Sequence, residues 1–204
     1  MTSEAYARRR LADCCRLLYQ RNLTVSAGGN MSVRLNENEI LITPSGVNKG
    51  LVSEDDFIVI DMKGDVVRGE GKPSIERYFH LGIYKANPET NAVLHCHPLY
   101  VLALAVKGEE IKTCLTPEGV LLLGHVPMVR YETPGSKELV DAVMEYATEP
   151  AMTMAKHGAI TQGRTLEEAF NRMEELEFQA HLQILAEGAE ELPEAEVAKL
   201  MGMR

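Results

Sequence analysis

Two predicted β-hairpins in the first third of the sequence limit the folds that this chain can adopt. Residues 31–43 and residues 57–69 each contain two short, largely apolar runs, separated by an Asn-rich turn in the first and by Lys63-Gly64 in the second. Successive hairpins produce antiparallel strand pairs, which excludes a fold of repeated β-α-β units. We therefore predict an α/β (α+β) fold, in which helices cover a central, mostly antiparallel β-sheet as a three-layer sandwich.

Apolar residues at helical spacing predict the segments that cover this sheet. In chain order, helices are expected at residues 4–21, 72–86, 100–106 and 136–147, and from Thr165 onward. The second helix is expected to enter at Pro73-Ser74 and to bury Ile75, Phe79 and Ile83. The last helix, with a capping box formed by Thr165 and Glu168, is expected to bury the stripe Leu166, Phe170, Met173, Leu176, Ala180 and Ile184.

Length and composition indicate one domain of a soluble protein. The 204 residues contain no linker-like or low-complexity stretch, so a single domain spanning residues 1–204 is expected. Residues 1–20 lack the continuous apolar run of a signal peptide or membrane span, which predicts a cytoplasmic protein whose four cysteines are buried thiols. A formal net charge of -9 without basic stripes predicts no nucleic-acid and no membrane partner.

The segment AVLHCH, residues 92–97, places two histidines two positions apart at the end of an apolar run. Residues at this spacing share one face of a β-strand, whereas on a helix they point in different directions. A turn signal precedes the run and Pro98 ends it, so we interpret the run as a strand that carries His95 and His97 side by side. Two converging imidazoles suit a metal ion, although a His-x-His pair alone is a weak signal.

A metal site needs at least a third ligand, and His157 is the candidate. It follows a short strand-like run and precedes Gly158, which allows the backbone to turn tightly beside a site. His80, His125 and His181 have no such setting, and we interpret them as structural residues.

Three short segments have the chemistry of an oxyanion site. SAGGN (residues 26–30) and TPSG (residues 43–46) are small-residue turns, which can direct several backbone N–H groups at one point. Ser74 lies at the start of a predicted helix, whose N-terminus offers further N–H groups. An ordinary turn or helix cap is the alternative interpretation of each. Glu76 lies in the first turn of the same helix, where a carboxylate is favoured with or without a catalytic role.

Six segments, taken in order, resemble the class II aldolase/adducin family. They are SAGGNMSVR, LITPSG, EGKPSIERYFHLGIY, NAVLHCHP, KHGAITQG and TLEEAFNRMEELE. Together they span roughly residues 24 to 177, and six ordered matches are far more specific than any one of them. Within the family, the segments are most similar to sugar-phosphate aldolases of the L-fuculose-1-phosphate type.

The resemblance implies a Zn²⁺-dependent lyase. It implies that His95, His97 and His157 bind the metal, and that Glu76 completes the resting site and then acts as the catalytic acid and base. The implied reaction is reversible cleavage of a ketose 1-phosphate to dihydroxyacetone phosphate and an aldehyde, by a homotetramer. The positions implied to hold the substrate phosphate are Gly29, Asn30, Ser45, Gly46 and Ser74.

Two positions depart from the pattern of these aldolases. Ile75 follows Ser74 where the family commonly has a second serine, and no tyrosine follows Tyr146 where the family has a proton donor to the aldehyde. Methylthioribulose-1-phosphate dehydratases have a similar set of metal ligands and the same Pro-Ser-x-Glu pattern. A lyase of that kind is therefore the alternative to an aldolase. A non-catalytic, adducin-like binding module is a second alternative. The retained histidines and Glu76 argue against it.

Overall fold

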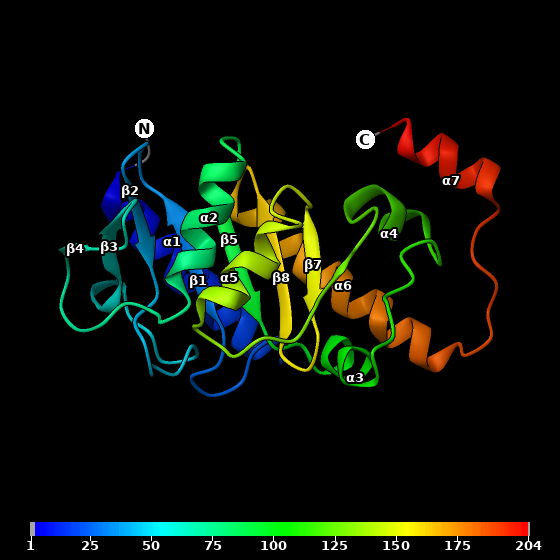
Figure 1. Ribbon diagram of the computed structural model, residues 1–204, viewed down its shortest axis with the longest axis horizontal. Coiled ribbons are helices and arrows are strands. Elements are labelled where there is room, and N and C mark those ends of the chain that lie inside the picture. Colours follow the sequence, from blue (N-terminus) through cyan, green and yellow to red (C-terminus); the bar gives the residue numbers. More distant parts are fainter. Residues whose placement is uncertain (1–2, 204) are drawn as a thin grey trace.

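The central element of the fold is one eight-stranded β-sheet (Figure 1). The computed structural model describes residues 3–203. The strands lie in the order β4-β3-β2-β1-β5-β8-β7-β6, and every neighbouring pair is antiparallel except β6 and β7. The predicted mostly antiparallel sheet is therefore confirmed. Its strands are β1 (Asn30–Arg34), β2 (Glu39–Ile42), β3 (Ile58–Asp61), β4 (Val66–Arg68), β5 (Ala92–Cys96), β6 (Met128–Val129), β7 (Ala151–Met154) and β8 (Gly158–Gly163).

Helices cover both faces of the sheet and complete the predicted three layers (Figure 1). One face is covered by α1 (Glu4–Gln20), α3 (Leu99–Lys107) and α6 (Leu166–Leu185). The other is covered by α2 (Arg77–Ala86) and α5 (Lys137–Met144). Two more helices lie beside these layers: α4 (Pro117–Leu122) packs on α6, and α7 (Glu194–Met201) packs on α4. A short 3₁₀ helix, η1 (Glu54–Asp56), contacts α1.

The central strands are apolar on both faces because each face has its own core. In β2, Leu41 packs under α1 and α6 while Ile40 and Ile42 pack under α2 and α5. In β5, Leu94 and Cys96 enter the first of these cores, as predicted for the face opposite the histidines. Side chains alternate between faces along a strand. His95 therefore points toward the α2 side.

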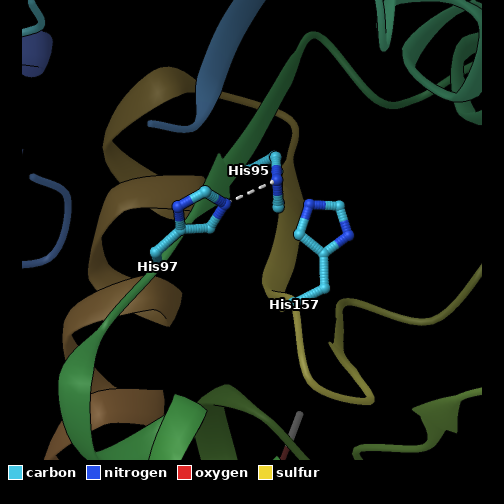
Figure 2. A group of neighbouring side chains, drawn as sticks. All are labelled: His95, His97 and His157. Atoms are coloured by element: carbon cyan, nitrogen blue, oxygen red, sulfur yellow. Dashed lines mark hydrogen bonds between the residues drawn. The ribbon is translucent and has the colours of Figure 1, made fainter. Parts of the chain in front are cut away.

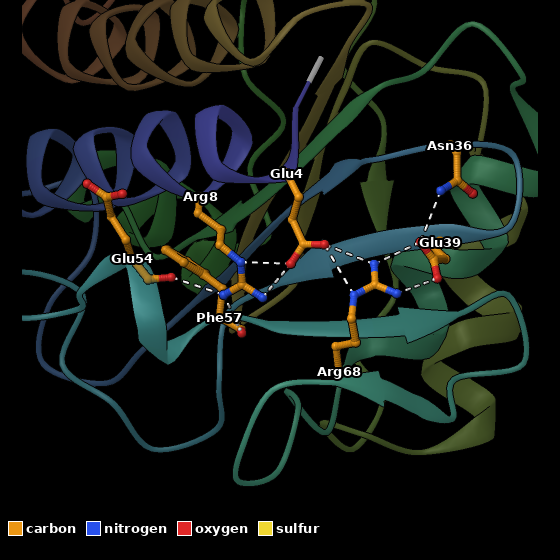
Figure 3. A network of polar contacts seen from close by, with 7 residues as sticks. All are labelled: Glu4, Arg8, Asn36, Glu39, Glu54, Phe57 and Arg68. Atoms are coloured by element: carbon orange, nitrogen blue, oxygen red, sulfur yellow. Dashed lines mark hydrogen bonds and ion pairs between the residues drawn. The ribbon is translucent and has the colours of Figure 1, made fainter. Parts of the chain in front are cut away.

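A network of charged side chains fixes α1 to the β4 edge of the sheet (Figure 3). The Arg68 guanidinium donates to Glu4 Oε2 at 2.9 Å and to Glu39 Oε1 at 2.9 Å. Arg8, one turn along from Glu4, donates to the carbonyl oxygens of Glu54 and Phe57, each at 3.0 Å. Exposed ion pairs contribute little individually. This network therefore sets the position of α1 more than it stabilises the fold.

The structure corrects three details of the predicted helices. The second helix begins at Arg77, because residues 72–75 pair with the TPSG turn instead of coiling: Ser45 N–H donates to Lys72 O at 2.9 Å. Ile75 is consequently 58% exposed and lies outside the predicted buried stripe. Ile184 is also exposed, because the last turns of α6 extend past the strands (Figure 1). The sequence analysis also missed α4, which Thr116 caps and Pro117 begins.

The expectation of buried cysteines is met at three of the four positions. Cys14, Cys15 and Cys96 are buried, whereas Cys114 is only half-buried. None of the helices within residues 3–203 is long and apolar enough to cross a bilayer. The single domain over residues 1–204 stays a prediction.

Candidate functional site

The three predicted metal ligands lie together at one end of the central strand β5 (Figure 2). His95 is in β5, His97 follows the end of that strand, and His157 is in the turn between β7 and β8. Antiparallel pairing of β5 with β8, with Cys96 opposite Ala159, brings the turn beside the strand end. One nitrogen from each ring lies within 4.8 Å of the others, so the three imidazoles surround one point.

Local contacts orient two of these rings. His95 Nδ1–H donates to Ala159 O at 2.9 Å, because a carbonyl oxygen can only accept, and this leaves the Nε2 lone pair free to bind a metal. His97 Nε2 lies 3.1 Å from His95 Nε2 (Figure 2). A backbone partner that fixes the tautomer of a ligand ring is typical of metal sites in proteins.

Glycines allow the loops to approach the histidines closely. A Cβ atom at Gly28 would lie 2.7 Å from His97 Nδ1, and one at Gly158 would lie 2.7 Å from His97 Cδ2. At Gly29, where φ is +71°, a Cβ would lie 2.5 Å from His95 O. The SAGGN turn therefore packs directly against the end of β5, and glycine is required there for space as well as for backbone conformation.

Burial favours the neutral form of all three imidazoles. It lowers the pKa of His95 well below its ordinary value, and the neighbouring rings of His97 and His157 lower this pKa further. Burial, followed by the effect of His157, lowers the pKa of His97, and burial lowers the pKa of His157. A neutral imidazole has the free lone pair that a metal ligand needs.

Glu76 places its carboxylate against the same cluster from the start of α2. The residue is 7% exposed; its Oε2 lies 3.4 Å from His95 Nε2 and its Oε1 lies 3.5 Å from His157 Nε2. Among the described residues, Oε1 is a buried atom without a hydrogen-bond partner. A buried, unpartnered carboxylate oxygen is costly. A cation among the three imidazoles would relieve that cost, so the donor set fits a divalent metal such as Zn²⁺.

The Asn30 side chain faces Glu76, which the sequence analysis did not predict. Its Nδ2 donates to Glu76 Oε2 at 2.8 Å and its Oδ1 contacts His80 Nε2 at 2.5 Å. Asn30 lies opposite His95 in the pairing of β1 with β5. Its side chain is thus engaged inside the protein, whereas its predicted contact with phosphate stays a prediction.

The three candidate anion segments are hydrogen-bonded to one another. Thr43, in the second segment, bonds to Met31, which directly follows the first: its N–H donates to Met31 O at 3.0 Å and its Oγ1 accepts from Met31 N–H at 3.1 Å. It also joins the third, because Ser74 N–H donates to Thr43 O at 3.3 Å. Ser45 and Gly46 are exposed, whereas Ser74 is 6% exposed and its Oγ accepts from Glu76 N–H at 3.2 Å. Of the predicted phosphate positions, Asn30 and Ser74 contact Glu76 directly, and the role of all five stays a prediction.

A buried lysine connects the two glycine-containing turns. Lys49 is 1% exposed, and its Nζ donates to Ala27 O at 3.0 Å and to Val47 O at 2.8 Å. No carboxylate forms an ion pair with it within residues 3–203, and burial lowers its pKa. A buried cation without an acidic partner favours a nearby anion. The sequence offered no signal for this role, since an isolated lysine is usually exposed.

A hollow of about 720 Å³ opens beside His97. Leu99 and Phe178 give it an apolar wall, and both are largely exposed. Tyr100 and His181 stack against each other at its side, with ring centroids 3.8 Å apart. Of the three clustered histidines, His97 lines this hollow.

A three-histidine cluster with an adjacent carboxylate lies at the ends of central strands of a mostly antiparallel sheet between helical layers, and this arrangement is compatible with a divalent metal ion. The chain belongs to the class II aldolase/adducin family, since the family described as Class II Aldolase and Adducin N-terminal domain matches residues 9–184. The predicted resemblance is thus confirmed.

Relatives with named activities are lyases, in agreement with the predicted enzyme class. The chain is 36% identical to a 3-oxo-tetronate 4-phosphate decarboxylase of Haemophilus influenzae, over 85% of this chain and 84% of that protein. It is 38% identical to an L-fuculose phosphate aldolase of Methanococcus vannielii, over 80% of this chain and 87% of that protein.

Solved structures agree with these relatives. The YgbL protein of Escherichia coli, whose activity is described only as aldolase, epimerase or decarboxylase, superimposes with a TM-score of 0.92 at 31% identity, covering 97% of this chain and 99% of its own. An L-fuculose 1-phosphate aldolase superimposes with a TM-score of 0.89 at 31% identity, covering 100% and 97%.

Proposed function

We propose that this protein is a Zn²⁺-dependent aldolase that cleaves a ketose 1-phosphate reversibly to dihydroxyacetone phosphate and an aldehyde. The observation that carries the proposal is the unpartnered Oε1 of Glu76, buried beside three neutral imidazoles. L-Fuculose 1-phosphate or a related deoxy or pentulose 1-phosphate is the proposed substrate. The similarity to named L-fuculose phosphate aldolases supports this choice.

The residues of the site divide the chemistry between charge stabilisation and proton transfer. A divalent ion held by His95, His97 and His157 would supply Lewis-acid stabilisation of the negative charge that develops on substrate oxygens when the carbon–carbon bond breaks, worth several kcal/mol in such sites. Glu76 is the group that carries a proton to or from the substrate carbon. Its burial excludes bulk water from this transfer.

Substrate phosphate is proposed to bind at Gly29, Asn30, Ser45, Gly46 and Ser74. The hydrogen bonds among these segments and the unpaired positive charge of Lys49 support this assignment. The overall charge of -9 would repel an anion, so local donors must hold it. The apolar wall of Leu99 and Phe178 suits an aldehyde that ends in a methyl group.

Decarboxylation of a 3-oxo-tetronate 4-phosphate is a second candidate. An aldolase needs a group that takes the hydroxyl proton as the aldehyde forms and returns it in the reverse reaction, whereas loss of CO₂ needs none, and residues 147–204 contain no tyrosine for that role. The relative from Haemophilus influenzae carries this activity in its name. Both reactions leave the same three-carbon phosphate carbanion, so the Glu76 proton transfer is common to them.

One substrate panel tests these alternatives. L-Fuculose, L-rhamnulose, 5-deoxyribulose and methylthioribulose 1-phosphates, and 3-oxo-tetronate 4-phosphate, are offered to the protein with and without a chelator. Dihydroxyacetone phosphate with an aldehyde supports the aldolase, dihydroxyacetone phosphate with CO₂ supports the decarboxylase, and loss of water alone supports the dehydratase. Absence of every reaction, with no stoichiometric metal in the purified protein, would support an adducin-like binding module.

Assembly and location complete the proposal. Membership of the family is the basis for proposing a homotetramer in the cytoplasm. Light scattering of the purified protein tests the tetramer, and a mass of about 90 kDa, four times the 22.6 kDa chain, is expected.

A further inference from the structure

A buried chain of four hydrogen bonds ends on the Glu76 carboxylate. Tyr84 OH lies 2.8 Å from Ser32 Oγ, which lies 2.8 Å from His80 Nδ1. His80 Nε2 lies 2.5 Å from Asn30 Oδ1, and Asn30 Nδ2 lies 2.8 Å from Glu76 Oε2. All five side chains are buried, and His80 is 0% exposed. Water therefore does not compete for these hydrogen bonds.

The donor and acceptor capacity of each group gives this series of hydrogen bonds a single direction. A carboxylate only accepts, so the Asn30 amide nitrogen must face Glu76 and its oxygen must face His80. That oxygen also only accepts, so His80 Nε2 carries the proton and Nδ1 has the lone pair. Ser32 O–H consequently donates to His80, and Tyr84 O–H donates to Ser32. Each donor is committed to one acceptor, from Tyr84 to Glu76.

The spacing of the two elements produces this alignment. Asn30 and Ser32 are two apart on β1 and share one face of the strand. Glu76, His80 and Tyr84 are four apart along the start and length of α2 and share one face of the helix. The strand face and the helix face meet, so their side chains alternate along the line of contact.

We propose that His80 is a positioning residue, which acts through Asn30 to hold Glu76 so that Oε1 is its reacting oxygen. Oε2 accepts from Asn30, whereas Oε1 has no partner among the described residues and lies 3.5 Å from His157 Nε2. A proton placed on Oε2 would face the Asn30 N–H group. A proton carried by the carboxyl group therefore resides on Oε1, which faces the histidine cluster.

A series of uncharged hydrogen-bonding side chains suits a carboxylate that must both accept and release a proton. An arginine or lysine beside Glu76 would orient it equally well, but would stabilise the anion strongly and weaken its basicity. One amide donor fixes the geometry with a smaller effect on charge. This inference rests on the proposed proton transfer by Glu76, and it adds the residues that decide which oxygen performs it.

Two substitutions of His80 separate positioning from packing. His80→Gln places an amide nitrogen about where Nε2 lies and keeps the donor to Asn30, whereas His80→Asn keeps a group near Nδ1 and loses that donor. We expect kcat of the Zn²⁺-loaded His80→Asn protein to fall by about 10- to 100-fold, with KM little changed, and the His80→Gln protein to keep most of the activity. Equal losses in both variants would overturn the inference.

A matched control accounts for lost stability. Thr90→Val removes a buried hydrogen bond to Gln162 at the opposite end of β5, so it lowers the unfolding free energy without touching the site. We expect it to leave kcat unchanged. If Thr90→Val lowers kcat as much as His80→Asn does, then a general loss of stability explains the lower kcat and the positioning role is wrong.

The tautomer of His80 gives a readout that needs neither activity nor a variant. In ¹⁵N-histidine-labelled, metal-free protein, we expect two-bond ¹H–¹⁵N spectra to show His80 with its proton on Nε2. A proton on Nδ1 would overturn the inference even if the His80→Asn protein did not fold. Failure of the proposed function is distinguishable, because a fully active Glu76→Gln protein would refute the proton transfer and leave the tautomer as it is.

Discussion

Two glycines with nearly the same backbone conformation allow one contact of the site to be isolated by substitution. Gly29 has a φ of +71° and Gly46 a φ of +75°, so alanine is strained at both. A Cβ at Gly29 would lie 2.5 Å from His95 O, whereas a Cβ at Gly46 would meet nothing within 4 Å. The difference in unfolding free energy between the two alanine variants therefore reports the contact of residue 29 with β5.

The expected losses of unfolding free energy follow from the backbone strain and from the contact with β5. The left-handed conformation costs alanine about 1 to 2 kcal/mol, which is the whole effect expected for Gly46→Ala. In Gly29→Ala the backbone of β5 must also move, and overpacking of this kind costs about 1 to 3 kcal/mol more. We therefore expect Gly29→Ala to lose about 2 to 5 kcal/mol of unfolding free energy.

Denaturant unfolding and metal titration measure the two effects. Gly29→Ala should also weaken Zn²⁺ binding, because the displaced carbonyl belongs to His95, whereas Gly46→Ala should bind Zn²⁺ like the unmodified protein. Equal destabilisation of both variants, with equal metal affinity, would refute the inferred packing of the SAGGN turn on the end of β5.

Three further predictions address charge and protons. Glu76→Gln should abolish turnover while the three histidines keep most of the metal, and metal analysis beside a product assay checks this; a normal rate would contradict the assigned role. Lys49→Met should weaken inorganic phosphate binding by at least about tenfold, or about 1.4 kcal/mol, in calorimetric titration, and unchanged affinity would exclude Lys49 from the anion site. The metal-free protein should lose stability in acid, because burial lowers the pKa of His80 to about 3 and lowers the pKa of His95 well below its ordinary value, while unfolded histidines protonate near 6.5. Its unfolding free energy should be constant above that pH and fall below it by about 1.4 kcal/mol per pH unit for each histidine that stays neutral, and stability independent of pH between 6.5 and 4 would show that these rings are not held neutral.

The sequence determined the features that depend on neighbours along the chain. Alternation in residues 92–97 was sufficient to place His95 and His97 on a strand end, and helical spacing was sufficient to predict α1, α5 and α6. The hairpins in residues 31–43 and 57–69 likewise predicted the antiparallel sheet. These are local preferences of backbone and side chain, and they can be read from one segment at a time.

Only the tertiary structure decided how distant segments meet. Pairing of residues 72–75 with the TPSG turn delays α2, exposes Ile75 and leaves Glu76 at the helix start. The sequence around His80 lacks a site-like setting and predicts a structural residue, since its partners, Asn30 and Ser32, lie about fifty positions away. The i, i+4 spacing of Glu76, His80 and Tyr84 was visible, but a helix face acquires a function only from the strand that it packs against. The direction of a buried polar side chain is fixed by long-range contacts, because these alone satisfy its hydrogen bonds away from water.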